Sequence, residues 1–516
     1  MRRLARVLLV TFFAAFGAQA EGAPASTPAA APSGVAWRPW SDDLFVTAKK
    51  EKKLVVLDLV AVWCHWCHVM DEKTYGSPDV ARLLGEKYIA VRVDQDARPD
   101  ISARYEDWGW PATIIFAPDG RELVKRSGYI PPDGMLSLLR AVVDDPTPGP
   151  SVRPEPKLAA PAAGALSPAL RAKLEAAYLE TYDAEHGSWG FVQKFLEPAS
   201  VELALIRAKA GDERAGEMAR QTLAAQRNLI DPVWGGVYQY STGGDWKEPH
   251  FEKLALFQAS NLRVYALAYG QWRDAGHLKA ARDIRRYVDA FLKSPEGAFY
   301  VSQDADAVPG EHGGEYFALD DAARRARGVP RVDTHLYARE NGRMIDALVA
   351  LWTATKEPDA LEEALTAARW VVANRSVEGG GFRHGAVDAG GPYLVDTASM
   401  GTAFVSLWEA TSDREWLDRA SAAADFIAKH FALPKGAGAG YSSLATTSKV
   451  TNVPRRPNRD ENLLVVRFAS ALARATGKSA HREMASEAMR FLASPAVATE
   501  RPVGPILLAD LEFSAR

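Results

Sequence analysis

The stretch that decides the fold is Leu57-Asp-Leu-Val-Ala-Val-Trp-Cys-His-Trp-Cys-His68, in which an apolar run leads directly into a pair of cysteines. The nearly continuous apolar run over 54–62 predicts a strand buried on both faces, and the cysteines then begin a helix. A helix N-terminus lowers the pKa of a thiol placed there, and only the thiolate is a nucleophile. We therefore expect Cys64 to attack a disulfide and Cys67, one turn later, to resolve the mixed disulfide.

Three further residues near the cysteine pair fit a redox centre. Asp58 is a carboxylate within the apolar strand, where burial is costly unless the group has a task, so we expect it to accept the proton of the resolving thiol. His65 follows Cys64 directly, and a cationic imidazole there would favour the thiolate. Pro111, within Gly109-Trp-Pro-Ala-Thr113, is expected to open a strand after a cis peptide bond and to present backbone groups to a bound peptide.

Three other interpretations of the cysteine pair remain open. The pattern Cys-x-x-Cys-His also occurs where haem c is attached. Cys64 and Cys67 with either His65 or His68 would suit zinc or copper, although the chain has no further cysteine for a second cluster. A purely structural disulfide is the third, but it would close only a tiny loop and so add little stability. Redox chemistry without a resident cofactor or metal is the favoured interpretation.

Strand and helix signals alternate around the cysteine pair. Pro118-Asp-Gly120 is a turn signal, so the apolar runs on either side of it should form a hairpin. We therefore predict a small α/β domain over residues 37–145. Its expected helices cover 42–52, 64–73, 78–86 and 132–143, and its expected strands cover 54–62, 88–93, 112–116 and 121–126.

Residues 1–20 have the three-part layout of a secretory signal peptide. Arginines at positions 2, 3 and 6 precede an apolar run from Val7 to Phe16, and small residues then lead to Ala20. A membrane-spanning helix needs about 20 apolar residues, and this run is shorter. We expect cleavage after Ala20, a flexible lead over 21–36, no membrane span in the mature chain, and export to the periplasm or beyond.

The rest of the chain differs from the α/β domain. Six prolines between positions 146 and 161 predict a linker over 146–167. Residues 168–516 alternate amphipathic helices with Gly-aromatic loops, which predicts helical hairpins closed into an all-α (α/α)6-type toroid. The expected helices cover 168–182, 199–209, 215–229, 251–273, 275–292, 341–356, 359–374, 396–411, 414–431, 460–476 and 479–492.

Loops between the helix pairs hold polar residues that we expect at the mouth of the ring. Glycoside hydrolysis needs an acid and a second carboxylate flanking the bond, whereas an epimerase would use histidines as acid and base. Capping of helices and turns is the structural alternative for the same residues. The expected ligand-binding residues are His250, Glu252, Asp304, Asp306 and Asp396, with Trp246 and Tyr238 as rings on which a sugar would stack.

The composition excludes some classes of partner. Hydrophobic residues make up 47% of the chain and charged residues 25%, which is typical of a globular protein. The net charge of −3 offers no basic surface large enough to favour nucleic acid. We therefore expect no nucleic-acid partner.

The spacing from Asp58 to Cys64, the tryptophan before the pair and the later Pro-x-Thr resemble thioredoxins. More narrowly, the chain is similar to the thioredoxin-domain family that includes the spermatogenesis-associated thioredoxin-like proteins and their bacterial relatives. That resemblance implies a six-hairpin glycosidase-like toroid after the thioredoxin domain. Trp63 departs from it, because a small polar residue is expected there. The motifs that carry the resemblance are Cys64-His-Trp-Cys-His-Val-Met70, Val93-Asp-Gln-Asp-Ala-Arg-Pro-Asp100, Gly109-Trp-Pro111, Pro249-His-Phe-Glu-Lys253, Gln303-Asp-Ala-Asp306 and Glu340-Asn-Gly-Arg-Met-Ile345.

Two functions are compatible with these features. The favoured one is thiol–disulfide exchange at Cys64 and Cys67, with protein thiols, protein disulfides or a redox protein as partner. The alternative is a carbohydrate-acting or carbohydrate-binding protein, with a hydrolase-like or epimerase-like toroid and an accessory thioredoxin domain. Carboxylates paired in one pocket of the toroid would favour the alternative.

Overall fold

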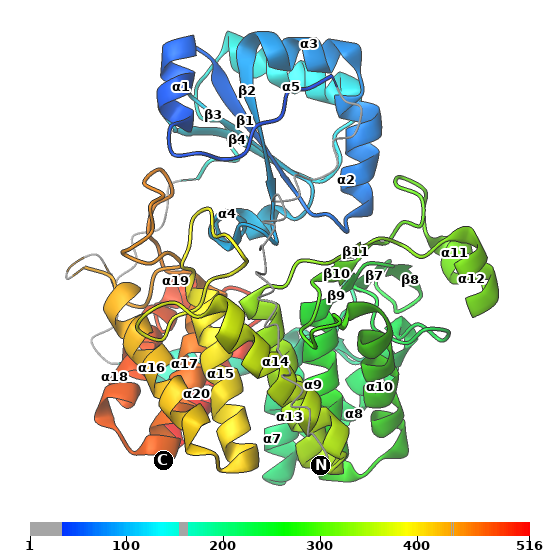
Figure 1. Ribbon diagram of the computed structural model, residues 1–516, viewed down its shortest axis with the longest axis vertical. Helices are drawn as coiled ribbons and strands as arrows, with labels where there is room; N and C mark the ends of the chain where they lie inside the picture. Colours follow the sequence, from blue (N-terminus) through cyan, green and yellow to red (C-terminus); the bar gives the residue numbers. More distant parts are fainter. Residues whose placement is uncertain (1–33, 154–163, 435, 437, 516) are drawn as a thin grey trace, which may run out of the picture.

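The computed structural model describes residues 34–153, 164–434, 436 and 438–515. It places an α/β domain on one end of a ring of helices (Figure 1). The predicted signal peptide, most of the predicted lead and the middle of the predicted linker lie outside the described residues. Both parts of the predicted fold class are confirmed.

A four-stranded sheet forms the centre of the α/β domain, in the order β2-β1-β3-β4. β1 (Leu54–Val60) runs parallel to β2 (Tyr88–Asp94) and antiparallel to β3 (Ala112–Phe116). The predicted hairpin is β3 with β4 (Glu122–Ser127). Every residue of β1 after the first is buried, as expected of a strand covered on both faces.

Helices cover both faces of this sheet. α1 (Leu44–Glu51) and α4 (Pro99–Tyr105) contribute to the core on one face, and α3 (Pro78–Lys87) and α5 (Pro132–Asp144) to the core on the other. α2 (His65–Met70) carries the cysteine pair and continues as a π-helical turn, Asp71–Tyr75. The sequence analysis missed α4, because seven residues are too few to show helical periodicity.

Twelve helices of the described residues form the ring. Six inner helices contact one another in sequence, and the last returns to the first: α7 (Pro198–Lys209), α9 (Ala255–Trp272), α13 (Ala338–Thr355), α15 (Leu394–Thr411), α17 (Arg459–Thr476) and α20 (Gly504–Ser514). Each packs against one outer helix: α8 (Glu213–Gln226), α10 (Ala275–Tyr287), α14 (Pro358–Arg375), α16 (Arg414–His430), α18 (Ser479–Leu492) and, for α20, α6 (Pro168–Glu180).

The helix that closes the ring, α20, was not predicted. Its sequence, Gly-Pro-Ile-Leu-Leu-Ala-Asp-Leu-Glu-Phe-Ser, is apolar on nearly every side, so it lacks the polar stripe that marks an amphipathic helix. α20 contacts α17, α7 and α6. The sixth hairpin therefore pairs the first and last helices of the domain, which lie more than 300 residues apart in sequence.

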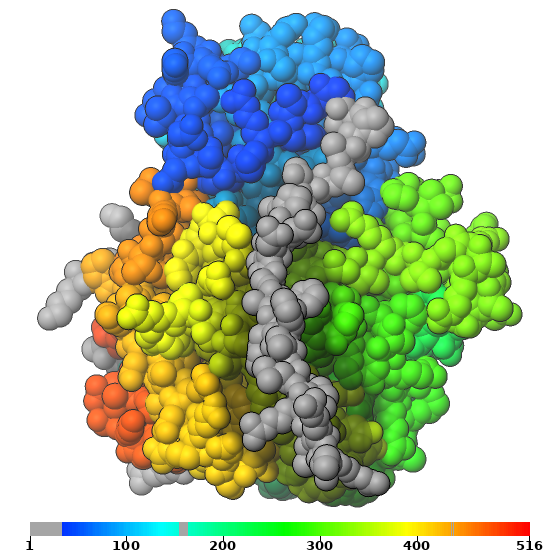
Figure 2. Space-filling model, in the orientation of Figure 1, coloured from blue at the N-terminus to red at the C-terminus, as the bar shows by residue number. Residues whose placement is uncertain are grey.

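The long loops of the ring precede its inner helices, so they gather at the end that faces the α/β domain (Figure 1). Figure 2 shows the α/β domain seated directly on this end. Short elements in these loops are β5 (Tyr182–Asp183), β6 (Ser188–Trp189), β7 (Tyr240–Thr242), β8 (Glu248–His250), β9 (Lys253–Leu254), β10 (Ser302–Gln303), β11 (Val332–Asp333), α11 (Gly314–Phe317), α12 (Asp321–Arg327) and α19 (Pro495–Ala498). No helix among the described residues is long and apolar enough to cross a membrane.

Candidate functional site

The cysteine pair lies where β1 gives way to α2, and Cys64 and Cys67 are joined by a disulfide. Cys64 occupies the N-cap position of α2 in an extended conformation, and its Sγ accepts the backbone N–H of Cys67 at 3.2 Å. The Trp63 and Trp110 rings pack edge to face beside the pair, with centroids 5.6 Å apart. The Trp110–Pro111 bond is cis, as the sequence indicated. Strand, disulfide and proline thus meet in one place.

The toroid covers this disulfide. Cys64 and Cys67 are each only 4% exposed and share a buried apolar cluster with Leu254 and Phe257 from the start of α9. The backbone N–H of Ala305 donates to the carbonyl of Trp63 at 3.4 Å. Residues some 190 to 240 positions later in the chain therefore enclose the disulfide.

Two histidines of the cysteine motif are anchored by one aspartate of the toroid. Asp306 Oδ1 lies 2.8 Å from His65 Nδ1, and Asp306 Oδ2 lies 3.0 Å from His68 Nδ1. His68 Nε2 is 3.1 Å from the carbonyl oxygen of Val62 and 3.5 Å from Asp304 Oδ2. Every neighbour of the His68 ring nitrogens is an acceptor, so this ring donates from both nitrogens and carries a positive charge.

Burial and mutual charge shift the pKa values in this cluster. Burial alone would lower the pKa of His68, but the hydrogen bond to Asp306 and the charges of Asp304 and Asp306 outweigh it and raise it. Burial would raise the pKa of Asp306, but hydrogen bonds from His65 and His68 lower it. Burial raises the pKa of Asp304 to about 6. The cluster is thus a buried ion pair around His68 and Asp306.

Glu252 adds a carboxyl of intermediate acidity beside this pair. It is 3% exposed, and its Oε2 has no hydrogen-bond partner among the described residues. Burial, with smaller contributions from Asp304 and Asp306, raises the pKa of Glu252 to about 7. Such a group holds or releases a proton near neutral pH, which suits acid–base chemistry next to a thiol.

The same cluster has the spacing of a metal site. Ligand atoms of His68, Asp304 and Asp306 all lie within 4.8 Å of one another. A metal ion would need a ring nitrogen of His68 without its proton, whereas the protonated ring donates to Asp306 and to the carbonyl of Val62. In the described arrangement these residues therefore satisfy one another as an ion pair.

Asp58 is held by an arginine beneath the cysteine motif. Its Oδ2 accepts the Nε of Arg92 at 3.0 Å, and Arg92 also pairs with Asp71. Asp58 Oδ1 has no hydrogen-bond partner among the described residues. Burial raises the pKa of Asp58 to about 6 against the opposing charge of Arg92. One oxygen is thus fixed and the other is unoccupied, as a proton acceptor requires.

The remaining residues chosen from the sequence have separate positions. The His250 ring stacks on Tyr240, with centroids 4.1 Å apart, and its Nδ1 lies 3.9 Å from Glu252 Oε2. Burial lowers the pKa of His250 to about 4. Tyr238 and Trp246 are buried in the core of the toroid, and the indole N–H of Trp246 donates to the carbonyl of His186. Neither ring is presented to a ligand.

Asp396 lies in a second contact between the domains. Its Oδ1 accepts His384 Nδ1 at 2.9 Å and the backbone N–H of Arg339 at 2.9 Å. His384 Nε2 donates to the backbone carbonyl of Asp96 in the α/β domain at 2.6 Å. The Asp96 carboxylate in turn accepts the indole N–H of Trp63 at 2.7 Å. Asp396 therefore contacts the α/β domain indirectly, through His384.

The sequence analysis missed Asp96, Arg339 and His384 as functional residues. The signal was present in Val93-Asp-Gln-Asp-Ala-Arg-Pro-Asp100, a polar stretch that directly follows a strand. Gln95, Asp96, Arg98 and Asp100 of that stretch are all buried. The buried Asp96 also explains the unexpected tryptophan at position 63, because the indole N–H of Trp63 donates to the Asp96 carboxylate.

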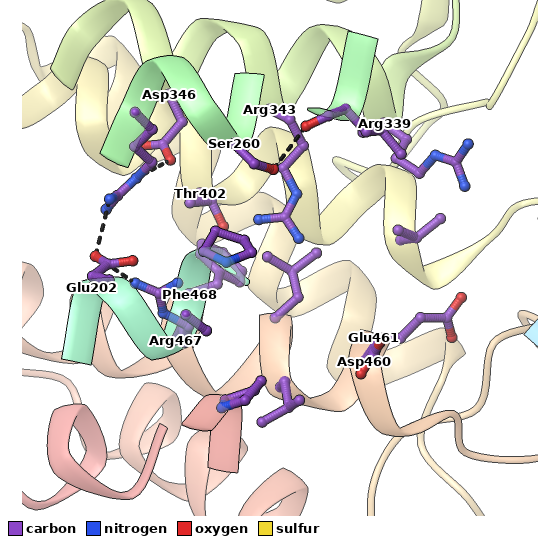
Figure 3. A pocket seen from close by; sticks show the side chains of 18 of the residues that line it. Glu202, Ser260, Arg339, Arg343, Asp346, Thr402, Asp460, Glu461, Arg467 and Phe468 are labelled. Atoms are coloured by element: carbon purple, nitrogen blue, oxygen red, sulfur yellow. Dashed lines mark hydrogen bonds and ion pairs between the residues drawn. The ribbon is translucent and has the colours of Figure 1, made fainter. Parts of the chain in front are cut away.

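The toroid contains a cavity of about 580 Å³ within its ring of inner helices (Figure 3). Residues from all six inner helices line it, together with residues of α4 from the α/β domain. None of the seven toroid residues chosen from the sequence does so. Among the described residues these seven therefore do not share one pocket: three of them, Glu252, Asp304 and Asp306, gather at the cysteine motif, because the α/β domain occupies the mouth of the ring.

Comparison with known proteins identifies relatives of the α/β domain and of a longer stretch of the chain. The family described as "Thioredox_DsbH: Protein of unknown function, DUF255" matches residues 27–144. Thioredoxin of Mycoplasmoides gallisepticum is 35% identical over 101 residues, which are 19% of this chain and 90% of that protein. Spermatogenesis-associated protein 20 of Mus musculus is 29% identical over 309 residues, 53% of this chain. The α/β domain of the chain belongs to the thioredoxin family.

The chain spans 39% of the length of the mouse relative. Thiol:disulfide interchange protein DsbD 2 of Pseudomonas aeruginosa is 32% identical over 105 residues, 19% of this chain and 18% of that protein. Among solved structures, a cellobiose 2-epimerase from Bacillus thermoamylovorans is similar over 63% of this chain and 86% of its own, with 10% identity and a TM-score of 0.49. A D-mannose isomerase covers 63% of this chain and 84% of its own, with 14% identity and a TM-score of 0.48.

Proposed function

We propose that the chain is a thiol–disulfide oxidoreductase in which Cys64 exchanges with the substrate and Cys67 resolves. The observation that carries this is the Cys64–Cys67 disulfide at the start of α2, beside Pro111 and next to a histidine paired with Asp306. The similarity of residues in the α/β domain to a thioredoxin and to a thiol:disulfide interchange protein supports the same chemistry.

The exchange balances as follows. A substrate thiolate attacks Cys64 Sγ, the Cys64–Cys67 bond breaks, and Cys67 leaves as a thiolate that takes up a proton. A second substrate thiolate attacks the substrate sulfur of the mixed disulfide and releases Cys64 as a thiolate. The substrate is oxidised by two electrons and the cysteine pair is reduced, and the reverse sequence reduces a substrate disulfide. Asp58, with its unoccupied Oδ1, is proposed to donate this proton to Cys67 and to accept it in the reverse sequence.

The toroid completes this site rather than standing apart from it. Asp306 holds the His65 ring beside Cys64 and a positively charged His68 one turn further along α2. Positive charge near a cysteine favours the thiolate. We infer that Asp306 is a positioning residue that adjusts the reactivity of Cys64 through these two histidines.

Burial of the disulfide restricts the partner. A cysteine that is 4% exposed and packed against Leu254 and Phe257 cannot meet another folded protein while the domains are docked. We propose that small thiols react with the docked protein, whereas a protein thiol reacts only after the toroid has moved off α2. The export predicted from residues 1–20 belongs to the same proposal, because an oxidising compartment keeps such a pair in the disulfide form.

The alternative is a carbohydrate-acting toroid. The three carboxylates expected to serve it, Glu252, Asp304 and Asp306, lie instead beside the cysteine motif, which favours the redox proposal. Thiol–disulfide exchange is therefore the function to test first. Cys67→Ser should accumulate a mixed disulfide with glutathione at Cys64, visible as a mass increase on the intact protein, whereas Cys64→Ser should not. Equal adduct formation by both variants, or by neither, would contradict the assignment.

A further inference from the structure

We propose that the cavity inside the toroid binds a small polyhydroxy carboxylate whose carboxylate pairs with Arg343. This site is distinct from the cysteine pair, and the proposal does not depend on redox activity. It rests on the one arginine of the cavity wall that the described residues leave without a partner.

Arg343 lies in the second turn of α13, and its guanidinium extends into the cavity between the inner helices (Figure 3). Within the part of the chain that the structure describes, no carboxylate or carbonyl oxygen accepts a hydrogen bond from it. A guanidinium has five N–H donors in a planar fork that matches a carboxylate. Arg343 is half-buried, so its free donors are open to a ligand in the cavity.

The carboxylates around Arg343 are already used. Glu202 bridges Arg263 at 3.0 Å and Arg467 at 2.9 Å. Asp346 pairs with Arg263 at 2.8 Å and accepts the hydroxyl of Ser406 at 2.6 Å. The carboxylates of this network have their ion-pair and hydrogen-bond partners without Arg343. The charge of Arg343 therefore faces the cavity.

A further carboxylate near Arg467 is also occupied. Glu512 on α20 accepts Arg467 Nε at 2.8 Å. At the other end of the cavity, Arg339 pairs with Glu340 and with Asp96 of the α/β domain. Each of these arginines has an acid of its own.

The pKa of Arg343 is consistent with an anion-binding site in the cavity. Burial lowers the pKa of Arg343 to about 10, and the charges of Arg467, Arg263 and Arg339 lower it further against the attraction of Asp346. Such a depression means that the cation is poorly compensated by its surroundings. A carboxylate in the cavity would supply the missing charge.

The rest of the wall offers acceptors for hydroxyl groups. The hydroxyls of Ser260 and Thr402 donate to backbone carbonyls at 2.7 and 2.9 Å, which leaves their lone pairs directed elsewhere. Glu461 Oε2 is buried without a partner among the described residues. Ligand hydroxyls can donate to all three. A carboxylate with several hydroxyl groups therefore fits this wall better than an apolar acid does.

The cavity is large enough and reaches solvent. Its volume of about 580 Å³ lies within the range of about 300–1,000 Å³ typical of small-molecule sites. Glu409 and Arg474, which line it at the C-terminal ends of α15 and α17, are exposed. Those ends point away from the α/β domain (Figure 1). A ligand therefore has a route to Arg343 that does not require the domains to separate.

Isothermal titration of the full chain with D-gluconate, and with sorbitol as the neutral molecule of the same carbon chain, tests the proposal. We expect gluconate to bind at least tenfold more tightly than sorbitol. Arg343→Gln should weaken gluconate binding at least tenfold, and Arg343→Lys, which keeps the charge and loses the fork, should give an intermediate loss. Arg414→Gln, on the exposed face of α16, is the matched control and should bind like the unaltered chain.

Equal gluconate affinity in Arg343→Gln and the unaltered chain would overturn the proposal, as would equal affinity for sorbitol or no binding of gluconate at all. Circular dichroism checks that Arg343→Gln folds. If that variant fails to fold, Arg343→Lys decides the matter, because unchanged gluconate affinity in it would exclude recognition by the guanidinium fork.

Discussion

Replacing Asp306 with Asn tests the main structural inference, that the toroid is joined to the redox site through a buried ion pair. Asn is nearly the same size but has no charge, and it offers one oxygen where the carboxylate offers two. In the structure those two oxygens face His65 and His68, and the second also accepts the backbone N–H of Gly310 at 2.8 Å. The variant therefore leaves at least one of these donors opposite an amide N–H.

The expected cost follows from these contacts. A hydrogen bond to a charged group contributes about 1.5–3 kcal/mol, and the partial exposure of the two histidine rings favours the lower half of that range. A loss of about 2 kcal/mol from domain docking corresponds to a roughly thirty-fold larger undocked fraction. Leu254 and Phe257 cover the cysteines only in the docked form, so Cys64 should become accessible in the same proportion.

Alkylation of the reduced protein by iodoacetamide, followed by mass spectrometry, measures this accessibility. Rates should be compared at pH 6, where His68 is protonated, and divided by the measured thiolate fraction so that the pKa of the thiol no longer matters. We expect Asp306→Asn to react roughly thirty-fold faster there than the unaltered chain. Asp133→Asn, an exposed position in the first turn of α5, is the matched control and should not change the rate.

The pH dependence has a defined sign. The pKa of His68 is raised on folding, so its contribution to docking is complete below its unfolded pKa of about 6.5 and is lost as pH rises through the folded value. Protection of Cys64, corrected for ionisation, should therefore decline from pH 6 to pH 8 in the unaltered chain and much less in Asp306→Asn. Identical corrected rates for the two proteins at pH 6 would refute the role assigned to the ion pair.

Two further predictions concern stability in urea unfolding. Burial raises the pKa of Asp58 to about 6 from an unfolded value near 3.9, so ionised Asp58 destabilises the fold progressively as pH rises between these values. The free energy of unfolding of Asp58→Asn should therefore exceed that of the unaltered chain by about 1–3 kcal/mol at pH 8 and should equal it near pH 3. A less stable variant at pH 8 would show instead that the ion pair of Asp58 with Arg92 dominates. Leu508→Ala on α20 should lower the free energy of unfolding by about 2–5 kcal/mol, because the Leu508 side chain is fully buried. The control Leu511→Ala, at a side chain that is 40% exposed, should lower it by less than about 1 kcal/mol. Equal losses would contradict the role of α20 in closing the ring.

Local sequence was sufficient for most of the elements. The apolar run before Cys64 predicted a central strand, and the turn at 118–120 predicted the hairpin. Eleven of the twelve ring helices were predicted from their length and local residue pattern, which are properties of neighbouring residues. α20 escaped because it is apolar nearly all round and α4 because it is short, so neither shows the 3.6-residue period.

The candidate site also has a part that the sequence predicted and a part that it did not. Sequence by itself determined the cysteine pair, its helix and Asp58, because a strand feeding a Cys-x-x-Cys helix is a local arrangement. Only the tertiary structure decided that Asp306 serves His65 and His68, some 240 residues earlier, rather than a ligand of the toroid. The physical reason is that a buried carboxylate must find a partner, and the sequence shows that need without showing which distant group the closed ring will place beside it.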